Sequence, residues 1–242
     1  MRGSIRKESD GTSGADGAAV STSCPSLALL ALLGTVLALV HLAAQALHAQ
    51  GTADLTQVLL MPALAAVLWT ATRAPRPRLV RLALLALSLS WAGDTLPRFV
   101  DGQAQFLAML GSFLLAQLVY ALAFLPRWRR SVLTRPPRML PYVAAVVVIV
   151  GLCAPAASAL LPAVIVYALA ICAMAVLATG LGRLGAVGGA VFVVSDALIA
   201  LNTFEVLALP AHSVWVMATY IAAQVLLVLA VIRDAERPAA PR

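Results

Sequence analysis

The chain has 242 residues, of which 62% are hydrophobic and only 11% are charged, and its mean hydropathy is +0.96. Soluble domains average about 45–50% apolar and about 25% charged residues, so this composition excludes a soluble globular enzyme, a disordered protein, collagen and a disulfide scaffold. The net charge of +7 would suggest a nucleic-acid partner in a soluble protein. In a membrane protein, however, basic residues gather in the cytoplasmic loops. The composition therefore predicts an integral membrane protein that binds no nucleic acid.

The two ends of the chain differ from the rest in composition. Residues 1–24 are rich in Ser, Gly, Ala and Thr and contain three acidic residues. Such a segment has little apolar surface to bury, which predicts a disordered polar tail. It does not resemble a signal peptide, because no apolar region directly follows its basic start. Residues 234–242 are predicted to form a short charged tail, which leaves residues 25–233 as a single membrane domain.

Long stretches without Asp, Glu, Lys or Arg predict the membrane-spanning helices. A spanning helix needs about 20 residues. The uncharged run 139–182 is long enough for two helices, and Pro155 and Ser158 near its middle predict a turn there. The runs 82–93 and 184–195 become full spans only if each helix continues through Asp94 or Asp196. The sequence thus predicts an all-α bundle of eight transmembrane helices, over residues 27–48, 54–72, 79–97, 104–125, 139–155, 158–179, 185–206 and 211–232.

The basic residues support this count. With eight spans, all of the 17 Lys and Arg residues except Arg98 fall in the two tails and in the loops on the same side. Because cytoplasmic loops are enriched in Lys and Arg, both termini are predicted to be cytoplasmic. Trp69 and Trp128 lie near the inner boundary, where aromatic residues anchor helices. We expect a multi-pass protein of the cell (plasma) membrane.

Three other patterns carry less functional weight. Gly180, Gly182 and Gly185 form a G-x-G-x-x-G motif, but no strand precedes it, so a dinucleotide site is not expected. Gly185 and Gly189 instead have the spacing of a helix-packing face. The cysteines, Cys24, Cys153 and Cys172, have no metal-binding or redox spacing. The histidines, His41, His48 and His212, fall toward the outer ends of the first and last spans, which leaves open a metal site shared with a carboxylate, although no metal ligand is predicted.

Asp94 and Asp196 are the most informative residues. An acidic side chain at a helix centre costs about 2.5–3.5 kcal/mol and usually faces the bundle interior or an aqueous cavity. Each aspartate follows an arginine, Arg81 or Arg183, by thirteen residues, which places it about 20 Å along its helix from the cytoplasmic boundary. The two carboxyl groups are therefore predicted to lie at matching depths.

Most of the other intramembrane polar side chains fall on the third, fourth, seventh and eighth spans. A polar cavity between these four helices is the simplest prediction. Candidate substrate-binding residues on them are Gln117, Tyr120, Ser195, Asn202, Tyr220 and Gln224.

Four segments resemble the signatures of the YhhN family of lysoplasmalogenase-like integral membrane proteins. They are Leu87-Ser88-Leu89-Ser90-Trp91-Ala92-Gly93-Asp94 in the third span, Gly111-Ser112-Phe113-Leu114-Leu115-Ala116-Gln117-Leu118-Val119-Tyr120 in the fourth, Gly189-Ala190-Val191-Phe192-Val193-Val194-Ser195-Asp196 in the seventh and Tyr220-Ile221-Ala222-Ala223-Gln224 in the eighth. Their order and spacing and the eight-helix count all fit, over residues 27–232.

The resemblance implies hydrolysis of the vinyl ether bond of lysoplasmalogens to a fatty aldehyde and a glycerophospho-base, with no soluble cofactor. The expected partners are this lysophospholipid-type substrate and membrane lipid. Two aspartates suit this chemistry, because protonation of the vinyl ether gives an oxocarbenium ion that a second carboxylate can stabilise. Asp94 and Asp196 are therefore the predicted catalytic residues. Which of them is the acid, the headgroup preference and the side of substrate entry stay open.

The chain departs from the family pattern at two positions, which keeps other functions open. Met61 stands before Pro62 where the family commonly has Lys, and Gln117 stands where it commonly has His. A catalytically altered protein that binds lipid or another small molecule is one alternative. A proton-coupled transporter is another, because intramembrane aspartates also relay protons. The absence of a clear internal sequence repeat speaks against the transporter.

Overall fold

The computed structural model describes residues 25–237, which form α-helices joined by short 3₁₀ turns and contain no β-strand. The predicted tail over residues 1–24 lies outside these residues, as do residues 238–242 of the predicted C-terminal tail. The eight α-helices of the described part are α1 (Pro25–Ala46), α2 (Gln50–Ala71), α3 (Arg78–Thr95), α4 (Gly102–Phe124), α5 (Leu140–Ala157), α6 (Leu161–Ala178), α7 (Arg183–Thr203) and α8 (His212–Ala235).

The helices are those of a multi-pass membrane protein, as the composition predicts. Within residues 25–237, seven helical segments are long and apolar enough to cross a membrane. The longest, Pro136–Leu181, has 46 residues and contains both α5 and α6. The turn between them differs slightly from the prediction. The helix passes through Pro155 and ends at Ala157, because the chain reverses only where Ser158 takes a positive φ of 43°.

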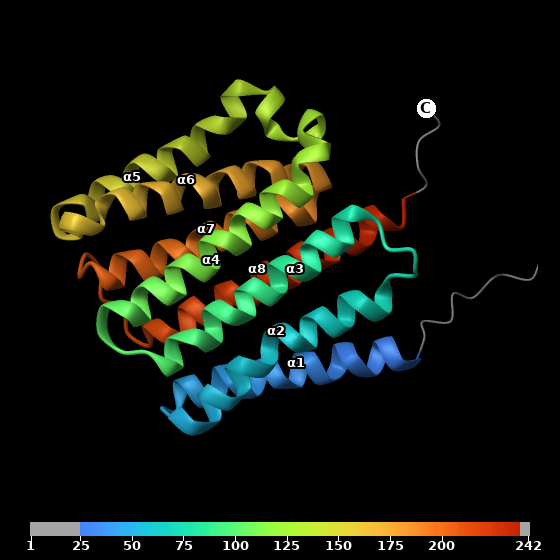
Figure 1. The fold of residues 1–242 in the computed structure, drawn as a ribbon, viewed down its shortest axis with the longest axis horizontal. Helices are drawn as coiled ribbons and strands as arrows, with labels where there is room; N and C mark the ends of the chain where they lie inside the picture. Colours follow the sequence, from blue (N-terminus) through green and yellow to red (C-terminus); the bar gives the residue numbers. More distant parts are fainter. Residues whose placement is uncertain (1–24, 238–242) are drawn as a thin grey trace, which may run out of the picture.

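Most helices that follow one another in the sequence pack side by side, and α8 lies among the earlier ones (Figure 1). It packs against α7 and also against α1, α2 and α3. On the other side, α4 packs against α3 and α6, and α5 lies outermost against α6 and α7. The beginning of α1 and the end of α8 lie at the same end of the bundle (Figure 1). Large apolar side chains such as Leu32, Leu39 and Val147 are exposed on the outer helices, as expected for surfaces that contact lipid tails.

The glycine-rich motif forms the tight connection between α6 and α7. At Gly180, an added Cβ would lie 2.7 Å from the backbone oxygen of Arg127, so another segment of the chain approaches closely there. Gly182 has a φ of +95°, which only glycine adopts without strain. At Gly185, an added Cβ would lie 2.1 Å from the carbonyl oxygen of Ala178. The motif thus serves chain reversal and close packing, and Gly189 packs likewise against Ala175 of α6.

An ion-pair cluster joins the loop after α4 to the end of α8. The Asp234 carboxylate is only 4% exposed, and Arg127 Nε donates to its Oδ2 at 2.6 Å. Arg130 and Arg237 lie 3.9 and 3.8 Å from its other oxygen. Three cations therefore surround one buried anion at the end of the bundle where the described chain begins and ends.

Substituting the glycine at the α6–α7 turn should destabilise the protein. Gly185→Ala places a methyl group against the Ala178 carbonyl, and overpacking of this kind costs about 1–3 kcal/mol. Gly151→Ala is the matched control, because no atom lies within 4 Å of its added Cβ. In detergent, the apparent melting temperature of Gly185→Ala should fall by several degrees while that of Gly151→Ala stays unchanged. Equal melting temperatures would contradict the packing role.

Candidate active site

A polar cavity of about 380 Å³ opens at the end of the bundle opposite the chain ends. Its position follows from the helices that contribute to it, because its lining includes the last residues of α1, α3 and α7 and the first residues of α4 and α8. We refer to it as the polar cavity. Its lining residues are Gln45, Gln57, Gly93, Asp94, Pro97, Arg98, Gln105, Met109, Phe113, Asp196, Ile199, Asn202, Thr203, His212, Ser213, Val216, Met217 and Tyr220.

Asp94 of α3 is buried in the inner wall of this cavity, and both of its carboxylate oxygens accept hydrogen bonds. Gln57 Nε2 of α2 donates to Oδ1 at 3.2 Å. The Tyr220 hydroxyl of α8 donates to Oδ2 at 2.9 Å. Buried polar groups that lack partners cost free energy, so these donors make the acid tolerable inside the bundle. The same two bonds tie α2, α3 and α8 together at one point.

Aromatic packing fixes the hydroxyl of Tyr220 on Asp94. The rings of Phe113 and Phe192 meet the Tyr220 ring edge-on, with centroids 5.7 and 5.8 Å away. Phe113 can approach because Gly93 has no side chain: a Cβ there would lie 2.9 Å from the Phe113 ring. Gly93 therefore makes room for the Phe113 ring, which packs against Tyr220 and orients its hydroxyl toward Asp94.

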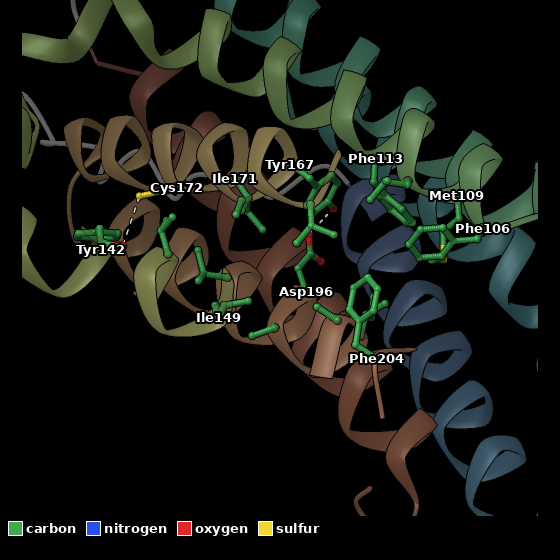
Figure 2. Close-up of a pocket in the computed structure, with 18 residues that line it drawn as sticks. Phe106, Met109, Phe113, Tyr142, Ile149, Tyr167, Ile171, Cys172, Asp196 and Phe204 are labelled. Atoms are coloured by element: carbon green, nitrogen blue, oxygen red, sulfur yellow. Dashed lines mark hydrogen bonds between the residues drawn. The ribbon is translucent and has the colours of Figure 1, made fainter. Parts of the chain in front are cut away.

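Asp196 of α7 lies where the polar cavity meets a second, apolar pocket. The two spaces share the side chains of Met109, Phe113, Asp196 and Ile199. The apolar pocket is otherwise lined by α4, α5, α6 and α7, almost entirely with hydrocarbon and aromatic groups. Figure 2 shows Asp196 near its middle, hydrogen-bonded by the Tyr167 hydroxyl of α6. Among the described residues, this hydroxyl is the only side chain that donates to Asp196.

The outer rim of the polar cavity carries a cation, Arg98, in the 3₁₀ turn after α3. Its Nε donates to the backbone oxygen of Asp94 at 3.2 Å, and its Nη2 donates to Gln57 Oε1 at 2.9 Å. Its Nη1 forms an ion pair with the exposed Asp54 carboxylate. Gln57 therefore connects the rim to the inner carboxylate, since its amide contacts both Arg98 and Asp94.

The structure brings four of the predicted site residues to the polar cavity, namely Asp94, Asp196, Asn202 and Tyr220. The other four lie between helices and line neither space. Tyr120 donates to Gln224 at 2.8 Å, and Gln224 donates to Ser90 at 3.1 Å, which joins α4, α8 and α3. Ser195 donates to the backbone oxygen of Val216 at 3.1 Å, and Gln117 is fully buried.

Three residues that contact the aspartates were not among the predicted site residues. Tyr167 lies in a span made almost entirely of apolar residues, and that isolation was the available signal. Gln57 instead lies beside Thr56 and near Asp54, at the start of its span. Arg98 was recognisable as the basic residue that departs from the charge pattern. What no pattern along the chain could supply is which helices would face one another.

The histidines do not gather into a metal centre. Within residues 25–237, no three His, Cys, Asp or Glu side chains lie close enough together to hold a metal ion. His41 is buried and hydrogen-bonds through Nδ1 to Thr56 Oγ1 at 2.9 Å, which ties α1 to α2. His212 lines the polar cavity from the start of α8. These histidines therefore serve helix packing and the cavity wall.

Comparison with known proteins identifies one family. The model of the YhhN family matches residues 52–231, which is most of the chain and includes both aspartates. The comparison with curated proteins gives no match, and neither does the comparison with solved structures.

Water should reach the polar cavity but not the lipid-facing side of the same helix. In a protein whose native cysteines are replaced, Asn202→Cys places a thiol on the cavity wall, and Val194→Cys places one on the exposed outer face of α7. A membrane-impermeant thiosulfonate should modify the first rapidly and the second at least about tenfold more slowly, because thiolates form in water and not in hydrocarbon. Mass spectrometry of intact protein measures both rates. If Asn202→Cys reacts as slowly as Val194→Cys, the cavity is closed to water.

Proposed function

The chain belongs to the YhhN family, and we propose that it is a lysoplasmalogenase-like hydrolase that cleaves the vinyl ether bond of lysoplasmalogens. One observation carries the proposal. Asp196 lies at the boundary between a polar cavity and an apolar pocket, and Asp94 lines the same polar cavity. In a lysoplasmalogen, the scissile bond joins a hydrocarbon chain to a polar glycerophospho-base. The two spaces suit the two halves of this molecule, and the bond to be broken then falls beside a carboxyl group.

The reaction begins with transfer of a proton from the Asp196 carboxyl group to the β-carbon of the vinyl ether. This carbon belongs to the hydrocarbon half of the substrate, and Asp196 lines the apolar pocket that would take this half. Protonation leaves an oxocarbenium ion, and water adds to the carbon next to the oxygen while giving a proton back to the Asp196 carboxylate. The resulting hemiacetal then collapses: its O–H proton passes to the glycerol-side oxygen, the bond from carbon to that oxygen breaks, and the hemiacetal oxygen becomes the carbonyl of the released fatty aldehyde. No atom other than those of lipid and water is consumed.

Asp94 serves as the ionised partner in this scheme. Its two oxygens accept hydrogen bonds from Gln57 and Tyr220, the arrangement in which a carboxylate acts as an acceptor. A fixed negative charge beside the reacting carbon stabilises a developing cation, because it is already in place when the positive charge forms. Asn202, which lines the cavity, is available to orient the headgroup or the attacking water.

The Arg and Lys distribution supports an orientation for this site. We propose eight membrane spans in the plasma membrane, with α5 and α6 crossing separately and both termini in the cytoplasm. The polar cavity then opens on the non-cytoplasmic side, because it lies at the end of the bundle opposite the chain ends. The headgroup of the substrate enters from that side.

Cysteine labelling tests this orientation. In a protein without native cysteines, Gln50→Cys lies in the α1–α2 turn, and Thr134→Cys lies in the Arg-rich loop before α5. Both positions are exposed. In intact cells, an impermeant maleimide should label position 50 only, and position 134 should label after the membrane is opened. Labelling of both positions from the same side would refute the proposed orientation.

Removal of either carboxylate should abolish most of the turnover. Asp94→Asn and Asp196→Asn keep the size of the side chain but can neither donate an acidic proton nor carry a negative charge. Loss of the general acid in Asp196→Asn should lower the rate about 10²–10⁴-fold. Loss of the stabilising charge in Asp94→Asn should lower it about 10²–10³-fold. Tyr167→Phe should lose about tenfold, because it removes one hydrogen bond to Asp196 and leaves both acids. The measurement is aldehyde release from a lysoplasmalogen per unit of monodisperse protein.

Asp101→Asn is the matched control, because Asp101 is an exposed acid that does not line the polar cavity. It should keep full activity. Near-normal turnover of Asp94→Asn or Asp196→Asn would remove that residue from the mechanism. If the unsubstituted protein binds lysolipids but releases no aldehyde across a survey of headgroups and chain lengths, the binding-protein alternative replaces the hydrolase.

A further inference from the structure

Arg98 is the one basic residue that departs from the charge pattern, and it lines the polar cavity. The proposed reaction uses the two aspartates and does not require a cation at the rim. A positive charge on the non-cytoplasmic side also runs against the distribution of the other basic residues. Its place on the cavity wall therefore calls for a function of its own.

The contacts of Arg98 leave part of the guanidinium group free to bind. A guanidinium has five N–H groups, and the three hydrogen bonds to the Asp94 carbonyl, to Gln57 and to Asp54 use one each. These bonds hold the planar group at the rim with two N–H donors left over. Its carboxylate partner Asp54 is 58% exposed, so water screens that ion pair and a better ligand can displace it.

The cavity wall also carries several neutral hydrogen-bonding side chains. Gln45, Gln105, Asn202 and Ser213 come from four different helices and face the same space. Among the described residues, Arg98 is the one Arg or Lys side chain on this wall, so it is the group that can pair with an anionic centre, while the amides and hydroxyls can bond further oxygen atoms.

We propose that the outer part of the polar cavity binds the phosphate group of a lysophospholipid and that Arg98 supplies the charge that recognises it. This assignment rests on the proposed function, because it places the headgroup of the same substrate. The phosphate oxygens take the two free N–H groups of Arg98 and compete with Asp54 for the guanidinium, which binds phosphate in bidentate geometry. Gln57, which contacts both Arg98 and Asp94, then links phosphate binding to the position of the inner carboxylate.

A pair of ligands that cannot be hydrolysed isolates this contact. One is 1-O-hexadecylglycerol 3-phosphate, whose ether is saturated, and the other is 1-O-hexadecylglycerol, which differs from it only in lacking the phosphate. Native mass spectrometry in detergent measures the dissociation constant of each. The unsubstituted protein should bind the phosphate-bearing ligand at least tenfold more tightly. Arg98→Gln should weaken that binding about 10- to 100-fold and leave the phosphate-free ligand unchanged, because a charge-assisted contact is lost. Arg98→Lys should retain part of the preference.

Two control variants separate recognition from folding. Asp54→Asn removes the ion-pair partner but leaves the guanidinium, so phosphate binding should be unchanged or tighter. Arg183→Gln removes an exposed arginine at the other end of the bundle and should change neither affinity. If Asp54→Asn weakens binding as much as Arg98→Gln, or if Arg98→Gln weakens both ligands equally, Arg98 is a structural residue and the proposal is wrong.

Competition with inorganic phosphate distinguishes the source of the anion. If inorganic phosphate binds in an Arg98-dependent manner while the ether lipid does not, the site takes a free anion and the headgroup assignment fails. Because neither ligand contains a vinyl ether, the result does not depend on turnover. If lipid binding depends on Arg98 but the protein releases no aldehyde, the phosphate-site proposal holds and the hydrolase proposal is wrong. If the protein cleaves lysoplasmalogens and Arg98→Gln changes neither lipid binding nor turnover, the hydrolase proposal holds and the phosphate-site proposal is wrong.

Discussion

A carboxyl group inside a membrane loses its hydration, and every other feature of this site follows from the need to replace it. Asp94 has hydrogen bonds from α2 and α8, and Asp196 has one from α6. Each acid therefore determines which helices must come together around it. These hydrogen bonds offset the free-energy cost of burying the two acids. They also fix the orientation of the carboxyl groups, both of which line the polar cavity.

The site joins a polar space to an apolar one. The helix ends far from the termini carry amides, hydroxyls and Arg98, whereas the space between α4, α5, α6 and α7 is lined with hydrocarbon. In the proposed function, the polar–apolar junction of the lysolipid lies at Asp196. Phe113 lines both spaces, and it packs against Tyr220 where Gly93 leaves room for its ring.

The two residues that depart from the family pattern, Met61 and Gln117, do not line the polar cavity. Met61 is buried in the core between helices and does not line the polar cavity. Gln117 is fully buried and lines neither the cavity nor the apolar pocket. Met61 therefore contributes to packing, whereas the Gln117 side chain lies beside the hydroxyl of Tyr167, the donor to Asp196. The groups that the proposed chemistry needs, namely the two aspartates and their donors, are all in place.

The sequence by itself determined the helices, the membrane setting and the two acids. Apolar runs of about 20 residues must be helical in a bilayer because backbone groups find no water there, and an acid within such a run is conspicuous for the same reason. It also pointed to the family, which the matched region confirms.

Only the tertiary structure decided which side chains bond to the two aspartates. Gln57 and Tyr167 donate hydrogen bonds to the aspartates from spans that the sequence did not assign to the site. Tyr120 and Gln224, which it did assign, bond to each other and do not line the cavity. Membrane helices are apolar on nearly all sides, so their periodicity does not reveal which face meets which neighbour. That choice depends on close packing at small residues such as Gly185 and Gly189 and on bonds between helices far apart in the chain.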